Sequence, residues 1–404
     1  MNAKSICLLA LSAIVCFAGD VVAQTAPQNF AGIPQPMGYG YPPVPTMGIM
    51  PTSTLMPVPG VMQAGATQPA NCAAGCCDTG GCQGRGCTGC GNCCTMGCCD
   101  PCGWSHRVFV YGEYLYLRSR DSEVTYAVES NVNAPTQPPV QRGRMGVVDQ
   151  DFSSGFRFGT GFTIDDCTSL GVRYTMFETE SLDQVTRQNP SFGIQSLLLH
   201  PGTVNTGEQG DGAWADHSIS FDLIDLEARR LFCHGRCYQI SGTFGARYAN
   251  LEQNFEHQVT NSNTNNSVAT DIDFEGAGLR LGLDMRGCCN LKNKLFLTAY
   301  CNTHVNFLAG EFNGTYIQGN QFNNSQVDTV WEAGRIVPMY ELEVGVGLCS
   351  PCGTWSVTCG YLYNAWANVV KTDDFIYAVH SSAFADVSDT ITFDGLVGRI
   401  EARF

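Results

Sequence analysis

The sequence is short of charge, and above all of lysine. Only 15% of its 404 residues are charged, and after Lys4 lysine occurs only at Lys292, Lys294 and Lys371. The formal net charge is −15, whereas binding to nucleic acid phosphates requires clustered Lys and Arg. The composition therefore excludes nucleic acid as a partner.

Long apolar runs and enzyme motifs are also missing. No run beyond the N-terminus reaches the ~18 apolar residues of a membrane-spanning helix, which excludes a helical membrane protein and leaves a β-barrel open. No P-loop, Rossmann glycine fingerprint or His-Glu-x-x-His motif occurs, and the glycines from Gly155 to Gly161 belong to a strand pattern. We therefore predict no enzyme activity, no catalytic residue and no cofactor.

The first 70 residues are typical of a secretory leader followed by a tether. Lys4 supplies a positive start, residues 6–18 form an apolar core, and the small residues up to Ala23 form a cleavage site. Residues 24–70 hold no charged residue but ten of the 18 prolines. We predict a signal peptide over residues 1–23 and an extended or disordered Pro-rich tether over residues 24–70.

Residues 71–104 form a Cys/Gly-rich segment with eleven of the 22 cysteines. A segment with so few apolar residues cannot bury a core, so that only covalent links or metal could order it. The pairs Cys87-x-x-Cys90 and Cys99-x-x-Cys102 have zinc-ribbon spacing, but an oxidising compartment favours disulfides. We predict disulfides and no metal, with zinc as the alternative; an odd number leaves at least one thiol for a partner outside the segment.

From residue 105 onward the hydrophobic pattern has a period of two. In the last nine residues Leu396, Ile400 and Phe404 share one parity with Gly398 and Ala402, while Arg399, Glu401 and Arg403 share the other. Nine more segments alternate in the same way: 108–117, 155–164, 168–177, 217–230, 238–249, 275–285, 295–307, 336–348 and 355–365. We predict an all-β fold, an up-and-down antiparallel transmembrane β-barrel of about ten strands (8–12), over residues 105–404. In segment 217–230 the apolar parity slips between Leu223 and Ile224, which predicts a β-bulge.

The polar parity combines glycine with charged residues, which favours a barrel lumen over the core of a soluble sandwich. Arg and Glu pair across a confined lumen, and Gly relieves crowding there. The predicted lumen-lining residues are Arg157, Arg173, Arg247, Arg280, Glu341, Glu343, Arg399, Glu401 and Arg403.

The connections alternate between short and long. Short turns are predicted at 165–167, 231–237, 286–294 and 349–354, and long loops at 118–154, 178–216, 251–274, 308–335 and 366–395. Because outer-membrane barrels have short periplasmic turns and long outer loops, the chain ends and the Cys/Gly-rich segment are predicted to be periplasmic. Every short turn carries one or two cysteines and no long loop carries any. The disulfide candidates are Cys233, Cys237, Cys349 and Cys352; links to the N-terminal segment, to other barrels or to cell-wall proteins are the alternative.

Several segments resemble the pore-forming outer-membrane barrel family typified by the Legionella major outer-membrane protein. They are 112–116 (Gly-Glu-Tyr-Leu-Tyr), 155–162 (Gly-Phe-Arg-Phe-Gly-Thr-Gly-Phe), 174–177 (Tyr-Thr-Met-Phe), 221–226 (Phe-Asp-Leu-Ile-Asp-Leu), 245–248 (Gly-Ala-Arg-Tyr) and the terminal Phe404. The resemblance implies a β-barrel porin or channel in the outer membrane. It brings no catalytic residue, and the tether and the Cys/Gly-rich segment depart from it.

Three functions are compatible with the sequence. The first is a porin-like channel for small hydrophilic solutes, with outer-membrane lipid and the barrel-assembly machinery as partners. The second is a structural envelope protein, in which the barrel anchors a disulfide network that links copies of the chain or cell-wall proteins. The third is a hydrolase with a site at the rim, where Asp216 and His217 are adjacent.

Overall fold

The structure is a computed structural model that describes residues 106–131, 140–165, 167–203, 210–234, 238–260, 265–292, 295–350, 353–385 and 387–404. The chain divides into two units, residues 12–86 and the remainder, and every described residue belongs to the second. The predicted signal peptide (1–23), tether (24–70) and Cys/Gly-rich segment (71–104) lie outside the described residues, so those predictions stay untested.

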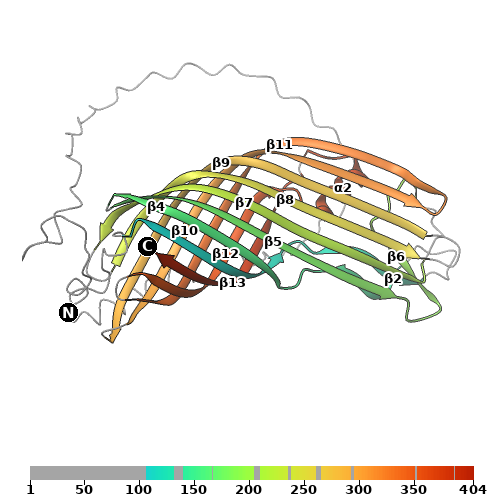
Figure 1. The fold of residues 1–404 in the computed structure, drawn as a ribbon. Coiled ribbons are helices and arrows are strands. Elements are labelled where there is room, and N and C mark those ends of the chain that lie inside the picture. Colours follow the sequence, from blue (N-terminus) through green and yellow to red (C-terminus); the bar gives the residue numbers. More distant parts are fainter. Residues whose placement is uncertain are drawn as a thin grey trace, which may run out of the picture. The chain divides into compact units, whose positions relative to one another are not determined.

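Ten antiparallel strands form a closed barrel, which confirms the predicted fold class and strand number. Around the barrel they follow the order β1-β13-β12-β11-β10-β9-β8-β7-β5-β4 (Figure 1). They are β1 (Val108–Arg120), β4 (Ser153–Asp165), β5 (Thr168–Thr186), β7 (Gly212–His234), β8 (Tyr238–Thr260), β9 (Asn265–Lys292), β10 (Leu295–Asn320), β11 (Asn323–Cys349), β12 (Trp355–Val369) and β13 (Asp389–Arg403).

The first and last strands close the barrel. β1 pairs with β13 from Phe109↔Arg403 to Arg120↔Thr392, and Val108 and Phe404 exchange backbone hydrogen bonds of 3.1 and 2.9 Å. This pairing leaves no unpaired sheet edge between β1 and β13. A strand in lipid requires this, because water cannot reach the backbone N–H and C=O groups of an open edge. We call this end of the barrel, where Val108 and Phe404 lie, the turn end, and the opposite end the loop end.

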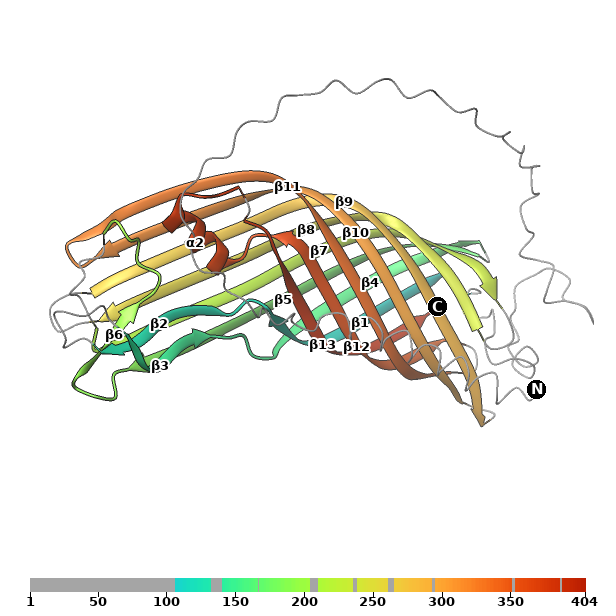
Figure 2. The ribbon, with the colours of Figure 1, turned by 180° about the vertical axis from the view of Figure 1, so that it is seen from behind.

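Three connections at the loop end carry structure of their own, which the sequence pattern did not predict. β2 (Val124–Asn131) and β3 (Gln141–Val148) follow β1, and β6 (Phe192–Ser196) follows β5; these strands form a separate sheet in the order β3-β2-β6. Helix α2 (Thr372–Ser381) follows β12. Figure 2 shows β2, β6 and α2 at the loop end, beside the long strands.

Local chemistry explains the bounds of α2. Asp373 and Asp374 lie in its first turn, where carboxylates complement the positive end of the helix dipole, and His380 lies in its last turn. Ser382 has the left-handed conformation of a C-cap (φ 54°) and its N–H bonds the carbonyl groups of Ala378 and Val379. Among the described residues no helix is both long and apolar enough to cross a membrane.

Two of the five predicted long loops are wrong. They are the loops predicted at 251–274 and 308–335. In the structure β8 ends at Thr260 and β9 begins at Asn265, and β10 ends at Asn320 and β11 begins at Asn323. Both connections are therefore short hairpin turns. The residues in question are rich in Asn, Gln, Ser, Thr and Asp, a composition that resembles a loop. They nevertheless alternate between buried and exposed positions along paired strands.

The predicted bulge between Leu223 and Ile224 is also wrong. β7 pairs with β8 in continuous register from Gly212 to Leu231, and the shift comes between Leu231 and Cys233. Leu223 is buried inside the barrel, whereas Ile224 is 47% exposed on its outside. The strand has no bulge between these residues. Instead, its apolar side chains change from the inner face to the outer face here.

The same exchange occurs all round the barrel. Toward the turn end an outward-facing apolar belt is exposed; examples are Phe156, Phe158, Val172, Ile224, Leu226, Phe244, Leu279, Leu281, Phe307, Val346, Val357, Leu396 and Ile400. Toward the loop end the long strands bury apolar side chains inside, as β8 does with Leu251 and Phe255. We refer to the two parts as the belt half and the loop half.

Candidate functional site

The lumen of the belt half is filled by charged side chains. Arg157, Arg173, Arg247, Arg280, Glu341, Glu343 and Glu401 are buried there, and the side chains of Arg399 and Arg403 are 14% and 18% exposed. These are the nine residues that the sequence places on the lumen side of the strands. Each has a charged partner within 4.0 Å.

The ion pairs connect walls that are distant along the sheet. Arg157 on β4 lies 2.7 Å from Glu113 on the adjacent β1 and 3.1 Å from Glu343 on β11, across the barrel. Arg280 on β9 lies 3.0 Å from Glu341 on β11, and Arg247 on β8 pairs with the same carboxylate. The network therefore bridges the lumen rather than lining an open bore. We call it the ion-pair layer.

Several members of this layer were not selected from the sequence. They are Glu113, Asp225, Glu227, Arg229, Asp284 and His304. With them the layer holds seven arginines (157, 173, 229, 247, 280, 399, 403) and seven carboxylates (113, 225, 227, 284, 341, 343, 401). Asp225 and Glu227 alternate with the outward Ile224 and Leu226 on β7, so that the parity of this strand is the signal that could have revealed them.

Glycine makes room for the layer at close approaches. A Cβ atom on Gly159 would lie 2.2 Å from the ring of Tyr111, and one on Gly282 would lie 2.2 Å from the ring of His304. Tyr111 in turn lies under the guanidinium of Arg399, with 3.8 Å between its ring centroid and Cζ, a cation–π contact. Larger residues at these glycines would displace the aromatic groups that fill the lumen.

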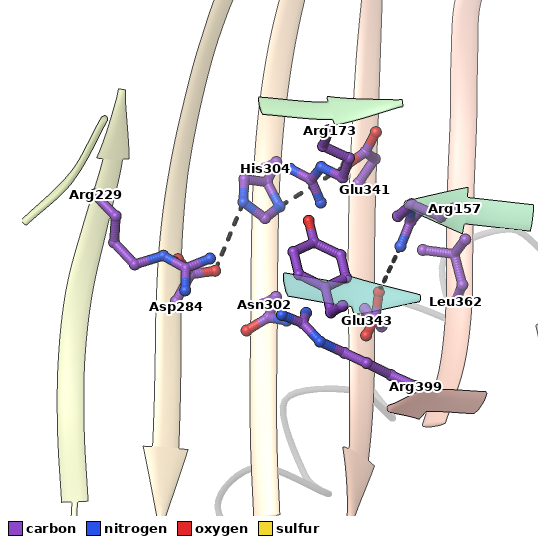
Figure 3. Close-up of a pocket in the computed structure, with 11 residues that line it drawn as sticks. Arg157, Arg173, Arg229, Asp284, Asn302, His304, Glu341, Glu343, Leu362 and Arg399 are labelled. Atoms are coloured by element: carbon purple, nitrogen blue, oxygen red, sulfur yellow. Dashed lines mark hydrogen bonds and ion pairs between the residues drawn. The ribbon is translucent and has the colours of Figure 1, made fainter. Parts of the chain in front are cut away.

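Little space remains within the ion-pair layer. A cavity of about 10 Å³ is lined by charged groups of β4, β5, β7, β9, β11 and β13 together with Tyr111, Asn302, His304 and Leu362. Figure 3 shows Arg157 reaching Glu343 and His304 reaching Asp284 around it. This volume is about that of one water molecule. The layer is therefore a seal.

A second seal lies directly toward the loop end. Phe177, Phe221, Trp366 and Phe393 form its centre, with ring centroids of Phe221 and Phe393 4.8 Å apart and those of Phe177 and Phe221 5.3 Å apart. All four are buried, and they belong to one continuous apolar cluster that includes Phe375 of α2. Close packing of this kind excludes water from the space that these side chains fill.

The candidate rim pair does not form a catalytic dyad. Asp216 and His217 are consecutive on β7, so their side chains point to opposite faces of the sheet. His217 is buried (1% exposed) and contacts Phe255 and Thr372. Asp216 faces outward, and the carboxylate cannot orient the imidazole.

The described cysteines gather mainly at the turn end, as predicted for the short turns. Cys167, Cys288, Cys289 and Cys349 lie beside connections there, as does Cys233, whereas Cys301 and Cys359 lie within strands. Cys233 and Cys349 carry free thiols in this structure, but their candidate partners Cys237 and Cys352 lie outside the described residues. The local disulfides stay a prediction. Within the described ranges no group of three or more His, Cys, Asp or Glu side chains could hold a metal ion.

The fold and its lumen define a class of protein. A closed antiparallel barrel with an apolar outward belt, a charged interior and no edge is an integral membrane β-barrel of the outer-membrane type. Residues 99–397 match the family model described as the Legionella pneumophila major outer membrane protein precursor. The chain belongs to this family of outer-membrane proteins, which confirms the resemblance drawn from the sequence.

Comparison with solved structures gives remote likenesses. The outer membrane protease OmpT of Escherichia coli is 8% identical, with 74% of this chain and 97% of that chain covered and a TM-score of 0.40. The toluene transporter TbuX of Ralstonia pickettii is 9% identical, with 74% and 90% covered and a TM-score of 0.31. The outer membrane protein OprG of Pseudomonas aeruginosa is 11% identical, with 73% and 96% covered and a TM-score of 0.24. No curated protein matches this chain.

Proposed function

We propose that this outer-membrane barrel is closed to solutes and acts as the membrane anchor of its N-terminal Cys/Gly-rich segment. The observation that carries the proposal is the double seal of the lumen. Ion pairs cross the lumen of the belt half from β4 to β11 and from β8 to β11, and the cavity of about 10 Å³ among them holds no more than about one water. A diffusion pore requires a continuous water-filled path.

The position at which the barrel begins supports an anchoring role. Arg107 is tied to the turn end by the 2.8 Å hydrogen bond between its carbonyl and the N–H of Thr163. The segment with eleven cysteines therefore joins the barrel at the end where Cys233 and Cys349 lie. In the proposed orientation this end is periplasmic, and disulfides from the segment link the barrel to other copies or to cell-wall proteins.

Two measurements test the proposal, one on the refolded barrel and one on isolated envelopes. We expect the refolded barrel to be silent in planar lipid bilayers and heat-modifiable on gels, which shows that the silence belongs to a folded barrel. On non-reducing gels of isolated envelopes we expect a high-mass ladder that dithiothreitol collapses. Replacement of the eleven cysteines of residues 71–104 by serine should abolish the ladder, whereas the matched change Cys301→Ser with Cys359→Ser should leave it intact. Stepwise conductance, or monomers under non-reducing conditions, would contradict the anchor.

A porin-like channel for small hydrophilic solutes is the second candidate. It is favoured by the seven arginines and seven Asp or Glu side chains that occupy the lumen of the belt half, and by family membership. This candidate requires that both seals move. A double variant, Arg157→Ser with Glu343→Ser, removes the cross-barrel pair, and a channel held shut by that pair would open more often. No change in conductance would leave the anchor as the better account.

A further inference from the structure

The loop half contains a plug built from three connections rather than from the barrel wall. It consists of β2, of β6 with residues 197–203, and of α2. Tyr126, Ile194, Phe375 and Ile376 of these segments are buried in the same apolar cluster as the wall residues Phe255 and Phe312. The wall and the plug are thus separate pieces of chain that share one core.

A histidine lies at three of the polar contacts that involve the plug. His217 of β7 places Nε2 3.4 Å from Oγ1 of Thr372, the first residue of α2. His257 of β8 places Nε2 2.8 Å from Oγ of Ser196, the last residue of β6. Inside the plug, Nε2 of His380 in α2 donates to the carbonyl of Leu198, 3.0 Å away. The histidines therefore join β7 to α2, β8 to β6, and α2 to the segment after β6.

The tautomer of His257 follows from its second contact. Its Nδ1 lies 2.9 Å from the carbonyl oxygen of Trp214, which only an N–H satisfies. Nε2 of the neutral ring is then an acceptor, and the Ser196 hydroxyl donates to it. The Leu198 N–H already donates to the same hydroxyl oxygen, at 3.2 Å. A proton on Nε2 would reverse this hydrogen bond and leave the Ser196 hydroxyl hydrogen without its acceptor.

No charged group faces these rings. His217 is packed against Phe255, Thr372 and the neighbouring Gln253. The adjacent Asp216 points to the opposite face of β7, and the charges that flank Thr372 are Lys371, which pairs with Asp389, and Asp373. Its Nδ1 has no hydrogen-bond partner among the described residues.

The ring of His257 has equally neutral surroundings, whereas the ring of His380 faces another titratable ring. His257 faces Tyr126, Ser196 and Trp214, with Asp183 one step away on the hydroxyl of Tyr126. His380 faces Tyr316 and His200. A proton on the buried His217 or His257 would therefore be an uncompensated charge in an apolar core, and a proton on the half-buried His380 would face the titratable ring of His200.

We propose that the plug is an acid-released device: neutral His217, His257 and His380 hold it in the barrel mouth, and their protonation frees it. Asp183 of the wall strand β5 accepts a hydrogen bond of 2.9 Å from the hydroxyl of Tyr126 in the plug. Further polar contacts between wall and plug come from uncharged side chains: Gln253 donates to the carbonyl of Val370 at 2.7 Å, Tyr316 donates to the carbonyl of Leu198 at 2.9 Å, and Gln318 accepts from the N–H of His200 at 2.7 Å and donates to Oγ1 of Thr203 at 2.7 Å. These uncharged side chains keep one charge state between pH 4 and pH 7, so they hold the plug at neutral pH without opposing its release.

The direction of the pH effect follows from where each state binds protons. His217 and His257 lie beyond the apolar belt, seven and nine positions from Ile224 and Tyr248 on their strands. Burial lowers the pKa of each to about 4, and burial also lowers the pKa of His380. An exposed histidine titrates near pH 6.5. The released state therefore takes up protons first, and the plug loses stability as the pH falls from about 6.5 to 4, by up to ~300-fold in the equilibrium constant for each of the first two histidines.

Acrylamide quenching of tryptophan fluorescence tests the device in the full chain, refolded in detergent. Trp366 is fully buried beneath the plug, and Trp331 packs against Phe375. We expect quenching to rise several-fold from pH 7 to pH 4, reversibly. The triple variant His217→Gln, His257→Gln, His380→Gln, which keeps side-chain hydrogen bonding, should show no such rise. The matched control His106→Gln lies at the turn end and should respond as the wild type does.

Each outcome decides the matter. Equal quenching at pH 7 and pH 4 in the wild type would overturn the device, as would a triple variant that responds like the wild type. Where the triple variant does not refold, each single variant should move the midpoint of the transition to lower pH; unmoved midpoints would likewise overturn it. The readout is independent of conductance and of disulfides, so that its failure and the failure of the anchoring role are distinguishable.

Discussion

The two halves of this barrel share the same hydrogen-bonded strands but place apolar and charged side chains on opposite faces. In the belt half apolar side chains face outward and the interior holds the fourteen charged groups of the ion-pair layer. In the loop half the interior is an apolar core, and the outward face carries acidic side chains. These are Glu178, Glu180, Asp216, Asp222, Glu252, Glu256, Asp271, Asp273, Glu275, Glu311, Asp328 and Glu332.

The difference teaches that the surrounding medium, and not the strand pairing, decides which face is apolar. Strand β7 crosses the boundary within four residues: Leu223 and Asp225 point inward, Asp222 and Ile224 outward. The belt half obeys the rule for lipid, and the loop half obeys the rule for water. Substitutions of the same type should therefore have different effects in the two halves.

The largest effect is expected from an unpaired charge in the belt half. Arg247 is buried and bonds both carboxylate oxygens of Asp225, at 2.5 and 2.7 Å. Arg247→Met keeps most of the volume but removes one of seven positive charges, and should lower the free energy of unfolding by about 3–5 kcal/mol. Urea titration in lipid vesicles measures it. The exposed Arg230→Met should change it by less than about 0.5 kcal/mol, and equal losses would refute the role of charge balance.

Next in size is the contrast between two phenylalanines. Phe221 is buried in the loop-half core, whereas Phe244 is 59% exposed in the belt. Phe221→Ala should cost at least about 3 kcal/mol, because the packed core cannot collapse into the cavity. Phe244→Ala should cost only about 1–2 kcal/mol, the lost transfer term, since lipid chains fill the space. The same urea titration compares the two variants. A larger loss of unfolding free energy for Phe244→Ala than for Phe221→Ala would contradict the view that Phe244 faces lipid and Phe221 lies in a packed core.

An arginine introduced on the outward face should change the stability of the barrel in opposite directions in the two halves. Leu281 lies between Leu279 and Leu283 in the belt, and Leu281→Arg should destabilise the barrel by about 2–4 kcal/mol. Asn313 on β10 lies opposite Asp273 on one side and Glu332 on the other. Asn313→Arg should therefore stabilise by about 0.2–1 kcal/mol. Destabilisation by both variants would mean that the acidic face does not lie in water.

Much of the belt half was predictable from sequence, because alternation of apolar with charged and glycine residues is a local signal. The ten strands and the lumen parity followed from it. The loop half was misread where outward Asn, Asp and Glu made strand residues such as those from Leu251 to Phe274 resemble loops. An exchange of faces looks like a bulge in sequence, as at Leu223 and Ile224. The plug could not be predicted, because α2 is stabilised by long-range packing against the wall rather than by its own ten residues.

The smallest effect tests the acidic face through pH. Asp273 on β9 lies directly opposite Glu252 on β8, and burial, with the neighbouring Asp271 and Glu252 carboxylates, raises the pKa of Asp273 to about 6. A carboxyl whose pKa is raised above its usual ~3.9 lowers stability at neutral pH and regains it as the pH falls through 6 toward 4. Asp273→Asn should therefore stabilise by about 0.5 kcal/mol at pH 7 and by almost nothing at pH 4.5, in urea titrations at both values. Asp328→Asn, opposite Ile317 on β10, is the control and should be neutral at both. A gain at pH 4.5 as large as at pH 7 would show that repulsion between carboxylates is not the cause.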